Sequence, residues 1–197
     1  MYLEKSLKEY SDLIASESLS PGSESSLAVT GTLASSLLIF YFKNIYRFKE
    51  DTEKLELRKI IKTMEQVKAE IMDAVDEAVV IYKNDNNPKE VVVKEGVVIP
   101  LLIAQKCNNL LECIVFVHET IGLVLNKDKY TAGLSAGTCK AKAGLMGSLF
   151  CVESNLKELE RGELSSFARD EKNRLMKRGE NNYQQIIAAI NNSWLVE

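Results

Sequence analysis

The sequence predicts an all-α protein: a bundle of long antiparallel helices around a central pair of helices rich in small residues. Apolar residues recur every three or four positions over long stretches, as in amphipathic helices. The 197 residues include only 10 Gly and 3 Pro, so few residues interrupt these stretches. A chain of this length is typical of one domain with a sizeable core. We therefore expect residues 1–197 to form a single helical domain.

The first predicted helix spans about Leu3 to Ala15, and the second begins after a cluster of Ser, Pro and Gly residues. Ser23 is the predicted N-cap of this second helix, which ends near residues 45–48. The stretch Ser25–Phe42 carries no charge and is just long enough to span a bilayer. Its hydroxyl side chains are spread around the helix, which favours a central bundle helix covered by its neighbours over a membrane span.

The third predicted helix runs from about Thr52 to Tyr82, with Asp51 as its cap, and Asn-rich residues 84–88 end it. Residues 91–99 are ambiguous, because two β-branched runs around a glycine are typical of a hairpin. A lone hairpin would have no sheet to join. We therefore favour a helix that bends near Pro100 and continues to about Leu125.

The fifth predicted helix spans about Tyr130 to Leu159 and is full of Gly, Ala and Ser. Each Gly lowers helix propensity by about 1 kcal/mol, so another backbone must approach closely. The second helix, with Gly31 among its small residues, is the expected partner. The C-terminal region 163–195 is charged, and we expect two helices in it, broken near Gly179.

Composition excludes several classes of function. The net charge of −3 gives no basic surface of the kind that binds nucleic acid. The four cysteines have no C-x-x-C spacing and the chain has one His, so we expect no metal site. The charged start of the chain is unlike a secretory signal, and we expect a cytoplasmic protein with no membrane contact.

Two places could carry chemistry. The turn Ser20-Pro21-Gly22-Ser23-Glu24-Ser25 precedes a helix start, where free N–H groups and the helix dipole attract anions. Every helix needs a cap, so chemistry alone favours a plain helix-entry turn over an anion site here. Histidine is the side chain best suited to acid–base chemistry near neutral pH, but the one His, His118, shares a stripe with apolar residues, so it is either a packed side chain or a weak catalytic candidate.

A group of lysines flanks the start of the fifth helix. It is either a solvated charge group or a patch that steers anions, and its members are Lys127, Lys129, Lys140 and Lys142. No Walker loop, G-x-S-x-G or dinucleotide fingerprint occurs in the sequence.

The order of these features resembles the formiminotetrahydrofolate cyclodeaminase / methenyltetrahydrofolate cyclohydrolase family over about residues 1–160. The Ser-rich turn enters a small-residue helix, and a long helix follows. A bent helix then carries Val98-Ile99-Pro100-Leu101-Leu102-Ile103-Ala104. A Gly/Ala-rich helix comes last and ends in residues 147–156.

The resemblance implies an all-α homodimer that acts on a folate one-carbon unit, and two apolar helices, the third and fourth, also favour a dimer. Family members close 5-formimino-tetrahydrofolate to 5,10-methenyl-tetrahydrofolate with loss of ammonia, or hydrolyse the methenyl ring. Neither reaction needs a metal or another cofactor. On this basis Lys129 and the six residues Ser20, Pro21, Gly22, Ser23, Glu24 and Ser25 are the predicted substrate-binding residues.

The polar positions depart from the family pattern. The family turn P-G-G-G-S is Pro21-Gly22-Ser23-Glu24-Ser25 here, so two glycines are lost and a carboxylate is gained. The family S-D pair falls on Ala132-Gly133. An acidic family position falls near Val75, flanked by Asp73, a second weak catalytic candidate, and Asp76. The alternative function is therefore a catalytically degenerate relative that binds a ligand or a protein; a small membrane-associated protein is the third and weakest hypothesis.

Overall fold

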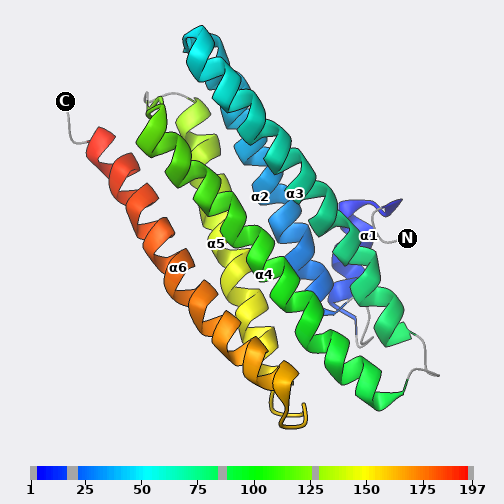
Figure 1. Cartoon of the computed structure of the whole chain (residues 1–197). Coiled ribbons are helices and arrows are strands. Elements are labelled where there is room, and N and C mark those ends of the chain that lie inside the picture. Colours follow the sequence, from blue (N-terminus) through cyan, green and yellow to red (C-terminus); the bar gives the residue numbers. More distant parts are fainter. Residues whose placement is uncertain (1–3, 17–21, 84–87, 126–128, 195–197) are drawn as a thin grey trace.

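The computed structural model is a bundle of long helices with a short N-terminal helix beside it (Figure 1). The structure describes residues 4–16, 22–83, 88–125 and 129–194. Every long element within these ranges is helical, as the all-α prediction requires. The elements are α1 (Leu7–Ile14), α2 (Ser23–Ile45), the 3-10 turn η2 (Tyr46–Phe48), α3 (Asp51–Lys83), α4 (Lys89–Thr120), α5 (Lys129–Asn155) and α6 (Glu163–Trp194).

The helices form two layers. Helix α2 packs on α3, α4 and α5, helix α5 also packs on α4, and α6 lies along α4 and α5 on the outside. Consecutive long helices run in opposite directions, so α2 and α5 are antiparallel and α2 and α4 are parallel (Figure 1). The start of α2 consequently lies beside the end of α5, where the Cys151 thiol contacts Ser23.

The predicted small-residue pair lies at the centre of the bundle. A Cβ placed on Gly144 of α5 would lie 3.7 Å from the backbone nitrogen of Gly31 in α2 and 2.8 Å from the Cys107 sulfur in α4. Two turns away, a Cβ on Gly137 would lie 2.8 Å from Leu38. Only residues without side chains allow two helices to approach this closely. The prediction of a central small-residue helix pair is therefore confirmed.

The ambiguous region 91–99 is helical, and α4 continues unbroken through Pro100, which is buried. The expectation that this helix extends to Leu125 is wrong. It ends at Thr120 because Gly122 adopts a left-handed backbone, φ +76°, and its N–H donates to the carbonyl of Val117 at 2.9 Å.

Two other expectations about helix boundaries are also wrong. Ser23 is the first residue of α2, and the extended Gly22 is the N-cap. The charged C-terminal region forms one helix, α6, which passes through Gly179. A Cβ on Gly179 would lie 2.1 Å from the side chain of Leu145, so this glycine permits close packing of α6 on α5 and does not break the helix.

Within the described residues, two helical segments are long and apolar enough to cross a membrane by length and composition alone: Ser23–Phe48 and Lys89–Thr120. In the bundle, 50% and 61% of their most apolar windows are buried. Neighbouring helices therefore cover more of the apolar surface of α4 than of α2, and one face of α2 remains exposed.

Candidate functional site

The start of α2 holds two buried polar residues. Only 7% of Glu24 is exposed, and Ser25 is fully buried. The Ser23 hydroxyl donates to the Glu24 carboxylate at 3.1 Å. The N-cap residue, Gly22, has no side chain to cap the helix. Glu24 is the acidic group of the first turn and lies where the helix dipole favours negative charge.

Two other helices contact this start. From α1, the Tyr10 hydroxyl lies 2.8 Å from the Ser25 hydroxyl in a buried hydrogen bond. From α5, the Cys151 thiol lies 3.5 Å from the Ser23 hydroxyl. Burial raises the pKa of Cys151, the Ser23 contact lowers it, and the negative charge of Glu24 raises it further. The thiol is consequently a neutral neighbour of the turn at physiological pH and not a thiolate nucleophile.

Ser20 and Pro21 lie outside the described residues, so the geometry of the predicted turn is known only from Gly22 onward. Tyr10 and Cys151 were not among the predicted site residues. Tyr10 occurs in sequence as one member of an apolar stripe, and nothing in that pattern distinguishes it from a core residue.

Lys129 begins α5 and therefore lies at the opposite end of the α2–α5 pair from Ser23. Lys129 and Cys151 are 22 residues apart on α5, which is about 33 Å at a helical rise of about 1.5 Å per residue. Within one chain the structure thus does not bring Lys129 to the predicted turn. Lys127 lies outside the described residues, and Lys142 faces α6, where it pairs with Glu180 at 2.5 Å.

Neither of the two weak catalytic candidates is a buried group at the turn. His118 is partly exposed near the end of α4, which is the end of the bundle opposite the start of the parallel helix α2. Asp73 is exposed on α3, and Val75 is fully buried in the core. Asp76, one helical turn from Asp73, is partly buried, and one of its carboxylate oxygens is shielded from solvent.

Gly133, where the sequence resemblance predicts an Asp, packs against the second half of α2. A Cβ there would lie 3.5 Å from the Phe40 ring. Phe40 lies 17 residues after Ser23, or about 25 Å along α2. In a single chain, an acid at residue 133 could not act at the Ser23 end of the helix.

The remaining cysteines and acidic groups do not suggest a metal centre. Burial raises the pKa of Cys107 to about 12, and burial together with the charge of Glu112 raises that of Cys113 to about 11, so both are packed thiols. In the part of the chain that the structure describes, no three His, Cys, Asp or Glu residues converge as ligands would.

Comparison with known proteins places this geometry in a family. The structure is similar to the crystal structure of formiminotetrahydrofolate cyclodeaminase from Thermotoga maritima, with a TM-score of 0.84 and 18% sequence identity over 98% of each chain. This likeness shows the fold. A search of curated proteins found no match. The sequence model of the formiminotransferase-cyclodeaminase family matches residues 6–174, which confirms the resemblance noted in the sequence: the chain belongs to the formiminotransferase-cyclodeaminase family.

Proposed function

We propose that this protein acts in folate one-carbon metabolism, in a cyclodeaminase- or cyclohydrolase-like conversion of 5-formimino- or 5,10-methenyl-tetrahydrofolate. The observation that carries the proposal is the family match over residues 6–174. The fold shared with formiminotetrahydrofolate cyclodeaminase supports it. We place the folate at the start of α2, on the turn of residues 20–25, because helix starts offer N–H donors to anionic groups.

The reaction sets requirements that can be compared with this site. In cyclodeamination the formimino carbon gains a bond to the second folate nitrogen and loses its bond to the nitrogen that leaves as ammonia. The attacking nitrogen loses its proton, and the leaving nitrogen gains two, so that the step takes up one proton in all; such transfers usually use a positioned acid or base. At the start of α2 the buried carboxyl group is Glu24, which accepts a hydrogen bond from Ser23. His118 lies at the opposite end of the bundle and Asp73 is exposed to solvent, so neither predicted candidate adds a buried acid–base group to Glu24.

The lack of a second acid–base group from the predicted candidates supports the second candidate function, a catalytically degenerate relative that binds a ligand or a protein. Gly133 stands at the family's Asp position, and Glu24 adds negative charge where an anionic folate tail would lie. Under this alternative a reduced folate binds without being converted. We expect low turnover and binding weaker than a glycine-rich turn would allow.

Two measurements distinguish these functions. Calorimetric titration with 5-formyl-tetrahydrofolate, a stable reduced folate, reports binding. The absorbance of 5,10-methenyl-tetrahydrofolate, followed with and without protein, reports conversion. Binding with brisk turnover supports the enzyme, and binding with little turnover supports the degenerate relative. A titration without heat and an unchanged absorbance would contradict both forms of the folate proposal.

We also propose a cytoplasmic homodimer that needs no metal or other cofactor and has no nucleic-acid or membrane partner. Support for the dimer comes from one exposed face of the α2–α5 pair, hereafter the α2/α5 face. Its members are Ser26, Thr30, Leu33, Leu37 and Phe40 of α2, and Ala136, Lys140, Ala143 and Phe150 of α5. Large apolar side chains stand out from it, with Phe40 47% and Phe150 64% exposed. A monomer mass by light scattering at micromolar concentration would contradict the dimer.

A further inference from the structure

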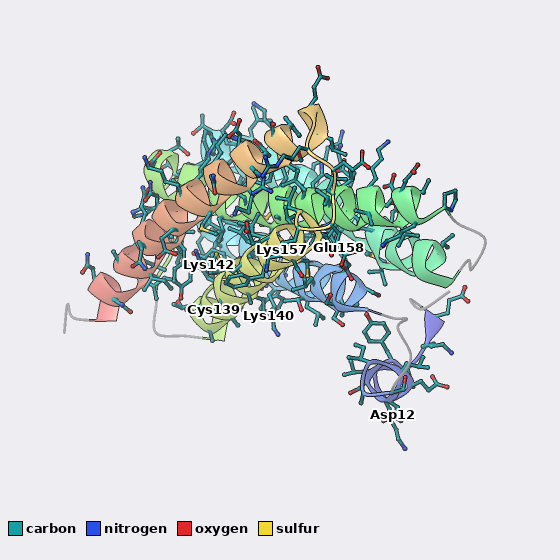
Figure 2. All side chains as sticks on the ribbon, turned by 90° about the horizontal axis from the view of Figure 1, so that it is seen from below. Asp12, Cys139, Lys140, Lys142, Lys157 and Glu158 are labelled. Carbon is teal, nitrogen blue, oxygen red and sulfur yellow. The ribbon has the colours of Figure 1, made fainter. Side chains whose placement is uncertain are left out.

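Helix α1 stands apart from the bundle. Figure 2 shows it standing off on the same side as the part of α5 that carries Cys139 and Lys140, with Asp12 directed away from the bundle. Among its described residues, Tyr10 is the one that is buried, through its hydrogen bond to Ser25. Leu13 packs partly against the core. Helix α1 is therefore attached along one side and overhangs the edge of α2.

The apolar side of α1 is wider than its contact with the bundle. Leu7 and Ile14 are two turns apart on the helix, next to Tyr10 on the same side. Leu7 is nevertheless 77% exposed, and Ile14 is also exposed. A short helix that leaves half of its apolar side in water is a typical element of a protein–protein contact.

The α2/α5 face provides a matching surface. It carries one charged residue, Lys140, which forms no ion pair within the described residues. Asp12 of α1 likewise forms no ion pair there. Since α1 lies at the Ser25 end of α2 and Lys140 lies in the first half of the antiparallel α5, Asp12 and Lys140 are at different ends of the face in one chain.

In a two-fold dimer whose axis is perpendicular to the helices, one end of the α2/α5 face in the first copy meets the opposite end of that face in the second copy. The Ser25 end of one copy then faces the first half of α5 in the other copy. This arrangement brings Asp12 toward Lys140 twice, once in each half of the interface. If the axis instead ran parallel to the helices, each Asp12 would lie on the same end as Asp12 of the other copy, and each Lys140 on the same end as Lys140 of the other copy, so like charges would come together.

We propose that α1 is a dimerisation arm: in the homodimer, α1 of each copy packs across the edge of the α2/α5 face onto the first half of α5 in the other copy. This inference rests on the dimer in the proposed function. It places the start of α2 of each copy at the interface, and it brings the region around Gly133 and Lys140 of one copy near Ser25 of the other. Elements that lie far apart within one chain would therefore meet between the two copies.

The first test changes the exposed side of the arm. The double variant Leu7→Glu/Ile14→Glu should raise the dissociation constant of the dimer at least tenfold in light scattering and sedimentation, with an unchanged circular dichroism spectrum. The matched control is Phe167→Glu, because Phe167 is similarly exposed but lies on α6. A dimer that is equally stable in the double variant overturns the arm and leaves the proposed dimer standing. A monomeric wild type overturns both, whereas folate binding is tested separately by calorimetry.

The second test uses the native exposed cysteine and does not depend on weakening the dimer. Leu7→Cys, made together with Cys151→Ser, should give a covalent dimer with a flexible bis-maleimide through Cys139 of the second copy. The same protein with Cys139→Ser, or without Leu7→Cys, should remain a monomer on a denaturing gel. A covalent dimer that forms without Cys139, or none at all from protein that is dimeric by light scattering, overturns the proposal.

Discussion

Helix α2 contains two regions that obey different constraints. At its centre, Gly31 meets Gly144 of α5, and the neighbouring atoms leave no room for a side chain. At its start, the fold accommodates the side chains of Ser23 and Glu24, which stand where the sequence resemblance predicts glycines. The comparison shows that close packing demands small residues at the centre of α2 and makes no such demand at its start.

The largest expected effect concerns the centre of α2. Gly144→Leu places a side chain where a Cβ alone would already lie 2.8 Å from the Cys107 sulfur. Overpacking should lower the free energy of unfolding by about 1–3 kcal/mol, measured by urea denaturation. The control is Gly162→Leu, since a Cβ at Gly162 would meet no heavy atom within 4 Å. Equal midpoints for wild type and Gly144→Leu would contradict the close crossing.

A second prediction concerns how α1 is attached. Tyr10→Phe removes the hydroxyl that lies 2.8 Å from the buried Ser25 hydroxyl. Losing this hydrogen bond should cost about 1 kcal/mol of unfolding free energy. It should also increase amide hydrogen exchange in α1 without changing exchange in α6. A variant with wild-type stability and exchange would show that Tyr10 does not anchor the arm.

The third prediction concerns the start of α2, where charge rather than packing is at issue. Glu24→Gly should tighten reduced-folate binding by about 0.5–1 kcal/mol, because it removes a like charge from the anion's site. Glu24→Gln keeps the side-chain size and should tighten binding in the same direction. It should also destabilise the fold by about 0.3–1 kcal/mol through loss of the favourable helix-dipole interaction.

Glu163 supplies a matched control for this experiment, because it is also an acidic residue in the first turn of a helix, α6. Glu163→Gln should change stability in the same direction and leave the calorimetric affinity for folate unchanged. Weaker folate binding in Glu24→Gly would show that the anionic part of the ligand lies elsewhere.

The smallest expected effect is a change in the reactivity of Cys151. The charge of Glu24 contributes to the raised pKa of this thiol. Glu24→Gln should therefore lower the pKa of Cys151, increase its thiolate fraction at mildly alkaline pH and speed its alkylation by iodoacetamide. An unchanged rate, measured by peptide mass spectrometry, would indicate that Glu24 and Cys151 do not interact in solution.

The sequence predicted the centre of the molecule better than its edges. Repeated small residues in two helices have one economical explanation, close packing, and Gly31 and Gly144 confirm it. Single glycines are less informative. Gly122 ends a helix through its left-handed backbone, whereas Gly179 lies inside one, and local sequence does not distinguish these uses.

The candidate site was only partly predictable for a related reason. The turn before α2 is a local feature, so its position could be read from residues 20–25. Tyr10, Cys151 and Lys129 are placed relative to it by the topology of the bundle, which brings the end of α5, and not its start, to Ser23. Residue types and spacing carry no signal for such contacts.

The most direct test of the central proposal, that a reduced folate binds at the start of α2, uses Cys151 as a reporter beside Ser23. Alkylation of Cys151 is followed as 5-formyl-tetrahydrofolate is added, with Ser166→Cys on the exposed surface of α6 as an internal control. We predict that the folate slows alkylation of Cys151 in a saturable manner and leaves the cysteine at position 166 unaffected. A folate that binds by calorimetry but does not protect Cys151 would contradict the proposed site.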